Sequence, residues 1–436
     1  MAEVIGNNLA SLICCVELVG KGIPVHHVVE SGRRIGGHFG GLPYQNTKID
    51  LGMVLLEPRL EVDSTDITQY QGEFGRELNQ FNKAVFDWLD KRNIELNKIE
   101  VCCFFNNKII GDLIISDDLS LLAELDHSEQ NQIIRELKDR QKSTIQHPKD
   151  KLEAEYFINT GLSDVYIALY GPTFSKYLLS NLDLLAGSSG SEISARFHRS
   201  LWAPLYYPEN IIKFLESGNS GILNLDFYVP SCGSISKLVQ AISSQLESSK
   251  SYSQDLVSRE QYSSIVDQLI LTESLDAAVF SDDRELRDFK IQIPTVDIGF
   301  VVAETESSKN CIIHNLEPTS PWYRAVLRGE DEGIVLVELG KISADESDYM
   351  LFERAQKCLL ALGVVSWSKP AVFRSKIACL TPSVSNEIEN SNFELSKNFE
   401  SNRSFFRSNE LTGSFNNQVC LGLKSATILI EGFRGE

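Results

Sequence analysis

Hydrophobic and polar positions at the amino end of the chain follow the order strand, helix, strand. Ala2 to Ile5 is an apolar run too short for anything but a strand. Leu9 to Gly20 is rich in Leu, Ile, Val, Ala and Cys, which is typical of a helix buried against a sheet. Gly22 and Pro24 end that helix, and Val25 to Val29 supplies the second strand. The pattern predicts a βαβ unit.

The rest of the chain carries apolar segments separated by long polar stretches. Residues 61–150 read as mostly exposed helix, and residues 381–412, rich in Asn, Ser and Glu, read as a loop or a weakly ordered excursion. Apolar runs predict strands at Asp276 to Phe280, Ile298 to Ala303 and Ile334 to Leu339, and helices at Ile235 to Leu246, Tyr349 to Leu362 and Val419 to Ile430.

Composition describes an ordinary globular protein. The 436 residues are enough for two or three domains, and 42% of them are hydrophobic and 23% charged. A net charge of -19 argues against nucleic acid or an anionic membrane surface as the main partner. No apolar run is long enough to span a membrane, and the sequence predicts a soluble, cytoplasmic protein. Nine cysteines without paired C-x-x-C spacing predict neither a metal site nor a disulfide framework.

The turn of the βαβ unit carries a reduced form of the dinucleotide fingerprint G-x-G-x-x-G. Gly6, Asn8 and Ser11 stand at its three glycine positions, so one glycine remains. The amino end of the following helix would hold a pyrophosphate, because its N–H groups are unpaired and its dipole is positive there. Asn8 tolerates a left-handed turn, but its side chain occupies space near the phosphates. Ser11 is a mild change, because it is small.

The second strand ends in an acid, and a glycine pair follows it. Glu30 stands where a carboxylate would accept hydrogen bonds from the ribose hydroxyls, although a solvated strand end is the alternative. Arg34 comes four residues later, and Gly36-Gly37 would let the backbone approach a cofactor closely. These positions extend the predicted cofactor site beyond the fingerprint.

The order of these segments resembles the FAD-containing amine oxidase superfamily, which includes protoporphyrinogen oxidase and UDP-galactopyranose mutase. Glu30, Arg34 and the pair Gly36-Gly37 have the spacing that is typical of this family. Four more segments resemble family motifs in the same order: Asp50-Leu51-Gly52, Tyr228 to Gly233, Asp276 to Phe280, and a closing motif from Gly413 through Ala426. The closing motif would direct a helix amino end toward the cofactor, with Asn417 as an amide beside the flavin.

The resemblance implies FAD as cofactor and an α/β fold. It implies a Rossmann-like FAD-binding domain of the glutathione-reductase type with a discontinuous α+β substrate domain. The FAD-binding segments would be residues 1–60, 220–290 and 396–436; a helical substrate domain would span 61–219 and a substrate sheet 291–395. The resemblance implies a small-molecule substrate as partner. A nucleotide-linked substrate and a phosphorylated one are both compatible with it. The oligomeric state, a homodimer included, stays open.

Several details on the substrate side resemble the sugar-nucleotide mutase branch. Asn106-Asn107-Lys108 follows an apolar run as the family's hairpin does. Arg196, Arg199, Tyr323 and Arg324 stand near positions where the family binds a substrate diphosphate, and guanidinium groups suit phosphate. Surface or interdomain ion pairs are the alternative for the first two arginines. His38 would lie near the flavin ring or on an exposed loop, and no residue is assigned as a general base.

Three functions remain open from the sequence. The first is an FAD-dependent oxidoreductase that transfers a hydride from a small substrate to the flavin. The second is a redox-neutral flavin-dependent mutase acting on a nucleotide-linked sugar. The third is a non-catalytic protein of this fold that has lost tight FAD binding, as the residues Asn8, Ser11 and Asn417 suggest.

Overall fold

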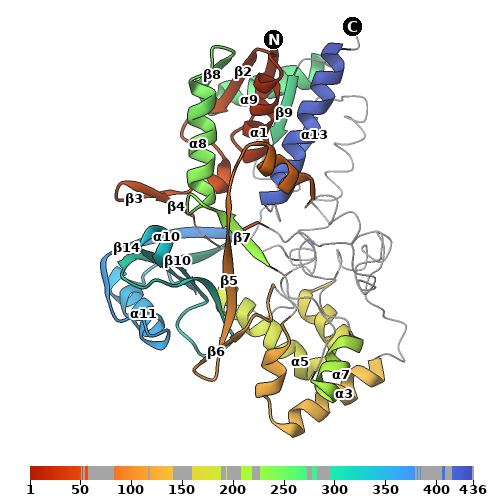
Figure 1. Ribbon diagram of the computed structural model, residues 1–436, viewed down its shortest axis with the longest axis vertical. Helices are drawn as coiled ribbons and strands as arrows, with labels where there is room; N and C mark the ends of the chain where they lie inside the picture. The colour runs from red at the N-terminus through yellow and green to blue at the C-terminus, as the bar shows by residue number, and fades with distance from the viewer. Residues whose placement is uncertain are drawn as a thin grey trace.

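The computed structural model in Figure 1 contains two units, each built around its own sheet. It describes residues 1–50, 52, 55–56, 83–115, 118–140, 160–187, 193, 208–218, 226–272, 277–281, 295–378, 381, 383, 405–407 and 415–434. Within these residues, no helix is both long and apolar enough to cross a bilayer.

The first unit is a parallel sheet of five strands in the order β15-β9-β1-β2-β8. The strands are β1 (Ala2–Ile5), β2 (Val25–Glu30), β8 (Tyr252–Val257), β9 (Ala277–Ser281) and β15 (Phe405–Arg407). The sheet is assembled from segments far apart in the sequence. The predicted strand–helix–strand start is confirmed, since β1 and β2 pair in parallel across α1 (Leu9–Gly20).

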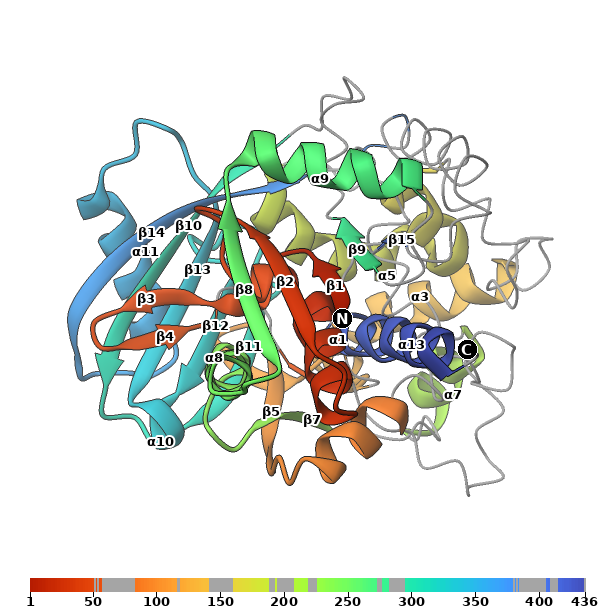
Figure 2. The same ribbon diagram turned by 90° about the horizontal axis from the view of Figure 1, so that it is seen from above.

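Helices cover both faces of this sheet (Figure 2). Side chains of α1, α8 (Ile235–Glu247) and α13 (Phe415–Arg434) share one apolar cluster with Val4 of β1. Tyr262 of α9 (Arg259–Thr272) packs with Ile5 and Val28 on the opposite face. Burial on two faces explains why the central strands β1 and β9 are short apolar runs without alternation. This is the predicted Rossmann-like layer.

The second unit is a mixed sheet of eight strands in the order β14-β10-β13-β12-β11-β5-β6, with β7 pairing β5. The strands are β5 (Leu96–Phe105), β6 (Lys108–Gly111), β7 (Phe227–Pro230), β10 (Thr295–Thr305), β11 (Asn310–Asn315), β12 (Arg324–Arg328), β13 (Ile334–Lys341) and β14 (Trp367–Ala378). β5 and β6 fall within residues 61–150, so the expectation of helix there is wrong for those strands. Ile99 and Cys102 to Phe104 of β5 are buried on a sheet instead.

Both faces of the large sheet are buried as well. Ile312 of β11 points into a cluster with α3 (His127–Arg140) and α5 (Leu162–Ala186), whereas Cys311 and Ile313 point toward α11 (Asp348–Ala361). The remaining elements are short: β3 (Leu42–Tyr44), β4 (Thr47–Ile49), α7 (Pro208–Ser217), α10 (Gly329–Glu332) and the 3₁₀ turns Gly37–Gly40 and Ser120–Glu124. The fold is therefore α/β with a discontinuous α+β unit.

Candidate functional site

The amino end of α1 lies where β1 ends, beside the second strand of the parallel sheet. Asn8 is the N-cap residue, with an extended backbone (φ -79°, ψ 173°), so it does not occupy the left-handed turn expected for it. Its side-chain oxygen accepts from Ser11 N–H at 2.9 Å. The Ala10 N–H is bound by the Gln418 side chain of α13 at 3.1 Å. Two backbone donors at the amino end of α1 are thus held by neutral amide oxygens.

Ser11 and Gly6 show how the shortened fingerprint still packs. The Ser11 hydroxyl lies 3.0 Å from the Gly6 carbonyl and 2.8 Å from the Asn8 carbonyl, so the serine closes the turn where a glycine would leave it open. Gly6 has φ +150°, and a Cβ there would lie 2.9 Å from Phe280. A glycine is therefore required at that position by contact with β9.

Glu30 lies at the carboxyl end of β2, as the sequence predicts, and its carboxylate is buried. Its Oε2 atom pairs with Arg33 Nε at 2.6 Å. Asn7 spans the gap between the two strands, because its amide accepts from Glu30 N–H at 2.9 Å and donates to the Glu30 carbonyl at 3.2 Å. Arg33 and Asn7 were missed by the sequence reading, since neither belongs to the fingerprint.

The glycine pair packs directly over the α1 amino end. Gly36 is left-handed (φ +83°) and forms an isolated parallel bridge with Asn8. A Cβ on Gly37 would lie 3.4 Å from the Asn8 Cα atom. Arg34 donates through Nη1 to the Gly41 carbonyl at 3.2 Å, which fixes the end of this loop. The structure thus brings together Gly6, Asn8, Ser11, Glu30, Arg34, Gly36 and Gly37 at one end of the parallel sheet.

Asp50 connects this loop to α8. Its two carboxylate oxygens accept from Ile235 N–H at 2.9 Å and Ser236 N–H at 2.8 Å, at the helix amino end where negative charge is stabilised. The Ser234 side chain caps the same helix through Lys237 N–H. Gly52 lies beside Arg324 of the large sheet.

The two units meet near Gly52. A Cβ on Gly52 would lie 3.8 Å from Arg324 Nη2 and 3.9 Å from His38 Cε1, so the three residues surround one point. Arg324 makes a buried bidentate pair with Glu338, through Nε at 3.0 Å and Nη2 at 2.8 Å. Its guanidinium carbon also lies 5.0 Å from the Tyr323 ring centre. Burial raises the pKa of Tyr323, which keeps that phenol neutral.

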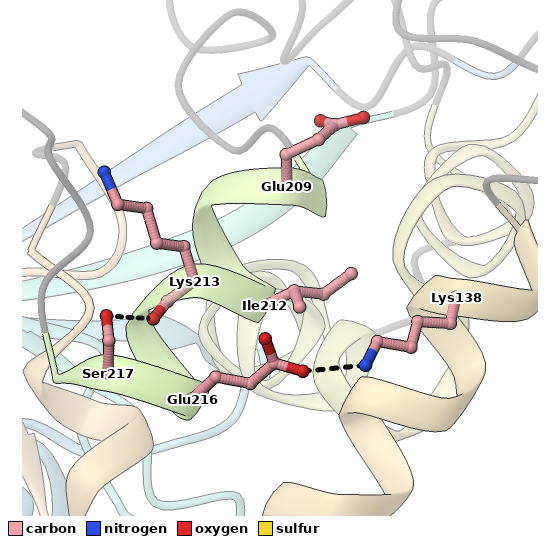
Figure 3. Close-up of a pocket in the computed structure, with 6 residues that line it drawn as sticks. All are labelled: Lys138, Glu209, Ile212, Lys213, Glu216 and Ser217. Atoms are coloured by element: carbon pink, nitrogen blue, oxygen red, sulfur yellow. Dashed lines mark hydrogen bonds and ion pairs between the residues drawn. The ribbon is translucent and has the colours of Figure 1, made fainter.

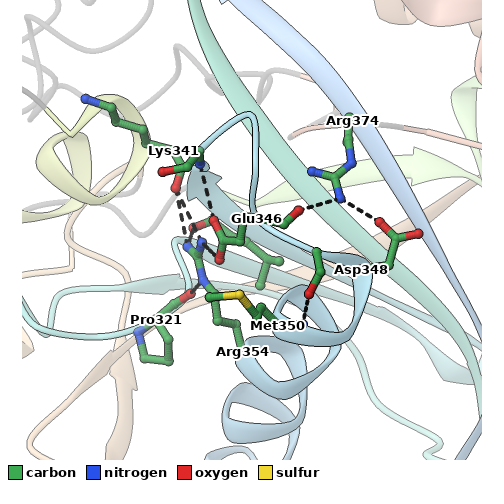
Figure 4. Close-up of polar contacts among 10 residues, drawn as sticks. Pro321, Lys341, Glu346, Asp348, Met350, Arg354 and Arg374 are labelled. Carbon is green, nitrogen blue, oxygen red and sulfur yellow. Dashed lines mark hydrogen bonds and ion pairs between the residues drawn. The ribbon is translucent and has the colours of Figure 1, made fainter.

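Arg354 of α11 fixes the chain that leads into Tyr323 and Arg324 (Figure 4). Its Nε atom donates to the Pro321 carbonyl at 2.8 Å, and Nη1 pairs with Glu346 at 2.9 Å. The same guanidinium binds the Leu339 and Lys341 carbonyls where β13 ends. The guanidinium of Arg354 is rigid and has five N–H donors. It thus connects the segment before β12 to the end of β13.

The other predicted site residues are not tested. Gly413, Arg196 and Arg199 lie outside the described residues. Asn417 lies in α13, and the position of its side chain is not among those described. Gln418, one residue further, is the one that reaches α1; its separation of 408 positions from Ala10 hides this contact from sequence patterns.

A surface cavity of about 300 Å³ lies apart from this junction, between α3 and α7 (Figure 3). Lys138, Glu209, Ile212, Lys213, Glu216 and Ser217 line it. Lys138 and Glu216 form an ion pair across it at 2.7 Å. Because its charges are mixed and solvated, we assign no chemistry to it.

A Rossmann-like unit with a helix amino end at its switch point, joined to a mixed sheet that covers it, defines the class of fold. Solved structures share it along the whole chain. A reduced UDP-galactopyranose mutase is similar with a TM-score of 0.62 and 12% identity, over 100% of this chain and 94% of that one.

A putrescine oxidase redesigned in its cofactor binding is similar with a TM-score of 0.51 and 12% identity, over 98% of both chains. No family model and no curated protein matches the sequence. At this identity the likeness concerns the fold, and the fold expected from the resemblance is confirmed.

Proposed function

We propose that this chain is an FAD-dependent enzyme. The observation that carries the proposal is the meeting, at the carboxyl ends of β1 and β2, of the α1 amino end, Glu30 and the Gly36–Gly37 turn. Ligands of doubly wound sheets bind at that edge, with phosphate on the helix amino end. The likeness to a mutase and an oxidase of the same fold supports it.

The residues at the α1 amino end fit a pyrophosphate once two side chains move. Asn8 and Gln418 present neutral amide oxygens to Ser11 N–H and Ala10 N–H, which are the groups that phosphate oxygens would accept from. Both are side chains on rotatable bonds, so the pyrophosphate, with its two negative charges, can displace them without moving the backbone. Glu30 keeps one carboxylate oxygen beyond its contact with Arg33 for a ribose hydroxyl.

The substrate side of the proposed site is the junction around Gly52. A bound flavin would supply the redox-active ring, and the chain supplies positioning. His38, Tyr323 and Arg324 would line this side. Because Glu338 holds the Arg324 guanidinium, we assign Arg324 to fixing Tyr323 and place the predicted diphosphate contacts on Arg196 and Arg199.

We infer that the reaction is a redox-neutral rearrangement of a nucleotide-linked sugar. Two observations support this choice. One is the higher TM-score of the mutase, which matches 100% of this chain. The other is the β5–β6 turn at Asn106 and Asn107, which the resemblance to that branch predicts. Hydride transfer from a small substrate is the second candidate, supported by the likeness to the oxidase.

Spectroscopy and turnover test the proposal in two stages. The purified protein is expected to show flavin absorbance and to release FAD on denaturation. UDP-hexoses incubated with dithionite-reduced protein should then give an isomer of equal mass, with no turnover by the oxidised protein in air. Turnover confined to the oxidised protein would favour the oxidoreductase.

A protein that does not bind FAD is the remaining candidate, and the occupied N–H groups of α1 favour it. It predicts a colourless protein that does not take up added FAD at micromolar concentration. That result would overturn the enzyme proposal, whereas uptake of one FAD per chain would exclude this candidate.

A further inference from the structure

Three buried side chains with metal-binding groups meet on the large sheet, one strand away from Arg324. Cys103 lies on β5, His314 on β11 and Asp112 directly after β6. Cys103 and His314 are direct partners in the parallel ladder between β5 and β11, so their side chains leave the sheet on the same face. Asp112 reaches them because β6 folds back along β5. All three are at most 1% exposed.

Two of the three distances between these groups are close to those around a small tetrahedral ion. Asp112 Oδ1 lies 2.9 Å from His314 Nδ1 and 3.4 Å from Cys103 Sγ, and the three ligand atoms all lie within 4.8 Å of one another. Ligands bonded to zinc at about 2.0–2.3 Å in a tetrahedron lie roughly 3.3–3.7 Å apart. The distance from Cys103 Sγ to Asp112 Oδ1 already lies in this range. The distance from Asp112 Oδ1 to His314 Nδ1 needs to lengthen by a few tenths of an ångström.

We propose that Cys103, Asp112 and His314 form a binding site for one divalent cation of the zinc class. Thiolate, carboxylate and imidazole are ligands that zinc prefers, and two anionic ligands balance its charge inside the protein. Backbone N–H groups orient both anions, since Leu113 N–H donates to Cys103 Sγ at 3.3 Å and Ile115 N–H to Asp112 Oδ2 at 2.7 Å. The fourth position is left to water or a small ligand.

The protons balance on binding. The Cys103 thiol loses its proton to solvent as the metal–sulfur bond forms. His314 would bind the ion through Nδ1 with the ring proton on Nε2, an atom that has no hydrogen-bond partner among the described residues.

Sequence spacing gives no sign of this site. Cys103 and Asp112 are 9 positions apart, and His314 is 202 positions beyond Asp112, so only strand pairing brings them together. The site is independent of the proposed FAD function, because it shares no residue with the α1 end or with the Gly52 junction.

The first test uses the wild-type protein. Chelator-treated protein is incubated with Zn²⁺ or Co²⁺, freed of excess metal, and analysed for metal content and absorption. We expect one metal per chain and, for Co²⁺, intense thiolate-to-metal charge transfer with tetrahedral d–d bands. Absence of retained metal, or Co²⁺ bound without a thiolate band, would overturn the proposal, whatever the flavin content.

The second test locates the ligands with a matched pair of variants. Cys103→Ser should abolish the charge-transfer band and weaken metal binding at least about tenfold. Cys102→Ser, one residue away and buried on the opposite face with the α11 cluster, should leave the band and the affinity unchanged. An unchanged band in Cys103→Ser, or its loss in Cys102→Ser, would place the metal elsewhere and reject the site.

Discussion

Asn8 occupies, with its own side chain, the place where a phosphate oxygen would meet α1. Replacing it by glycine restores the second fingerprint position and frees Ser11 N–H. Glycine is nearly as good an N-cap as asparagine, so Asn8→Gly should change the free energy of unfolding by only a few tenths of a kcal/mol. We expect FAD affinity to rise several-fold, measured by quenching of flavin fluorescence.

A second N-cap serves as the control for this variant. Ser347 caps α11 through Met350 N–H, away from the α1 end. Ser347→Gly should leave FAD affinity unchanged while altering stability as little. If Asn8→Gly weakens FAD binding, Asn8 is itself a cofactor ligand and its displacement by phosphate is ruled out.

Glu338 and Arg324 form the most completely buried ion pair of the junction, at 4% and 8% side-chain exposure. Glu338→Ala leaves the guanidinium without its carboxylate, and we expect a loss of about 3–5 kcal/mol in unfolding free energy by urea titration. The double variant Arg324→Met, Glu338→Leu should recover most of it, because neither charge then remains. Equal losses in both variants would show that packing, and not charge, accounts for the cost.

At the scale of residues, the sequence predicted which positions lie at the candidate site but not which residues they contact. Glu30, Gly36 and Gly37 follow from a motif with fixed spacing, and they lie together as expected. Gln418, Arg33 and Glu338 could not be found in this way, because a hydrogen-bond partner is set by packing between distant segments and has no local pattern. The Cys103 cluster escaped for the same reason.

Among the elements, β2 carries a histidine that holds the fingerprint turn in place. His27 Nε2 donates to the Gly6 carbonyl at 2.8 Å, and Nδ1 lies 2.8 Å from the Tyr252 hydroxyl. Burial lowers the pKa of His27 to about 4 from 6.5, although the bond to Gly6 acts in the opposite direction. The ring is therefore neutral at pH 7.

This pKa makes the stability of the parallel sheet depend on pH. Between pH 6.5 and 4 the unfolded chain binds a proton that the folded chain does not, so stability falls as the pH is lowered through this range. The contribution is about 3 kcal/mol for a pKa difference of this size. In His27→Gln, which cannot titrate, the difference between unfolding free energies at pH 6.5 and pH 4 should shrink accordingly.

The neighbouring histidine provides the comparison. His26 is partly exposed and lies beside Glu3 and Asp255. His26→Gln should keep most of the loss of stability that we expect for the wild type below pH 6.5. An equally steep loss in His27→Gln would mean that other groups cause it.

Elements with a clear apolar period were predicted closely. The helix expected at Leu9 to Gly20 has those bounds, and the one expected at Ile235 to Leu246 ends one residue later. β8 was missed, because it is an edge strand with mostly polar, exposed side chains. β5 was hidden within a long polar stretch, where only its second half is apolar. A local sequence pattern indicates which residues are buried. β8 and β5 are stabilised by pairing with neighbouring strands, which such a pattern does not indicate.

At the scale of the molecule, an ion pair with a buried carboxylate and a partly exposed lysine joins the two units. Lys237 of α8 reaches Glu332 of α10 at 2.6 Å, and Glu332 is 4% exposed. Burial raises the pKa of Glu332, and Lys237 opposes this shift. Lys237→Met removes the cation that balances the carboxylate, and we expect a loss of about 2 kcal/mol, between the values for surface and fully buried pairs.

An exposed pair between β5 and the residue before β7 gives the matched control. Lys98 contacts Asp226 with both side chains largely in solvent. Lys98→Met should change the unfolding free energy by less than about 1 kcal/mol, because solvent screens that pair. Equal effects of the two variants in urea unfolding would argue against a special contribution from the Lys237 pair.

The close crossing of α1 and α13 has a consequence for how the protein is made. A Cβ on Gly422 would lie 2.6 Å from the Ala10 carbonyl and 2.7 Å from Ile13, so the two backbones touch. The part of α1 that α13 covers thus depends on a helix made much later, since Ala10 and Gln418 are 408 positions apart. A nascent chain stalled before α13 would expose that apolar side of α1 and would be a substrate for chaperones.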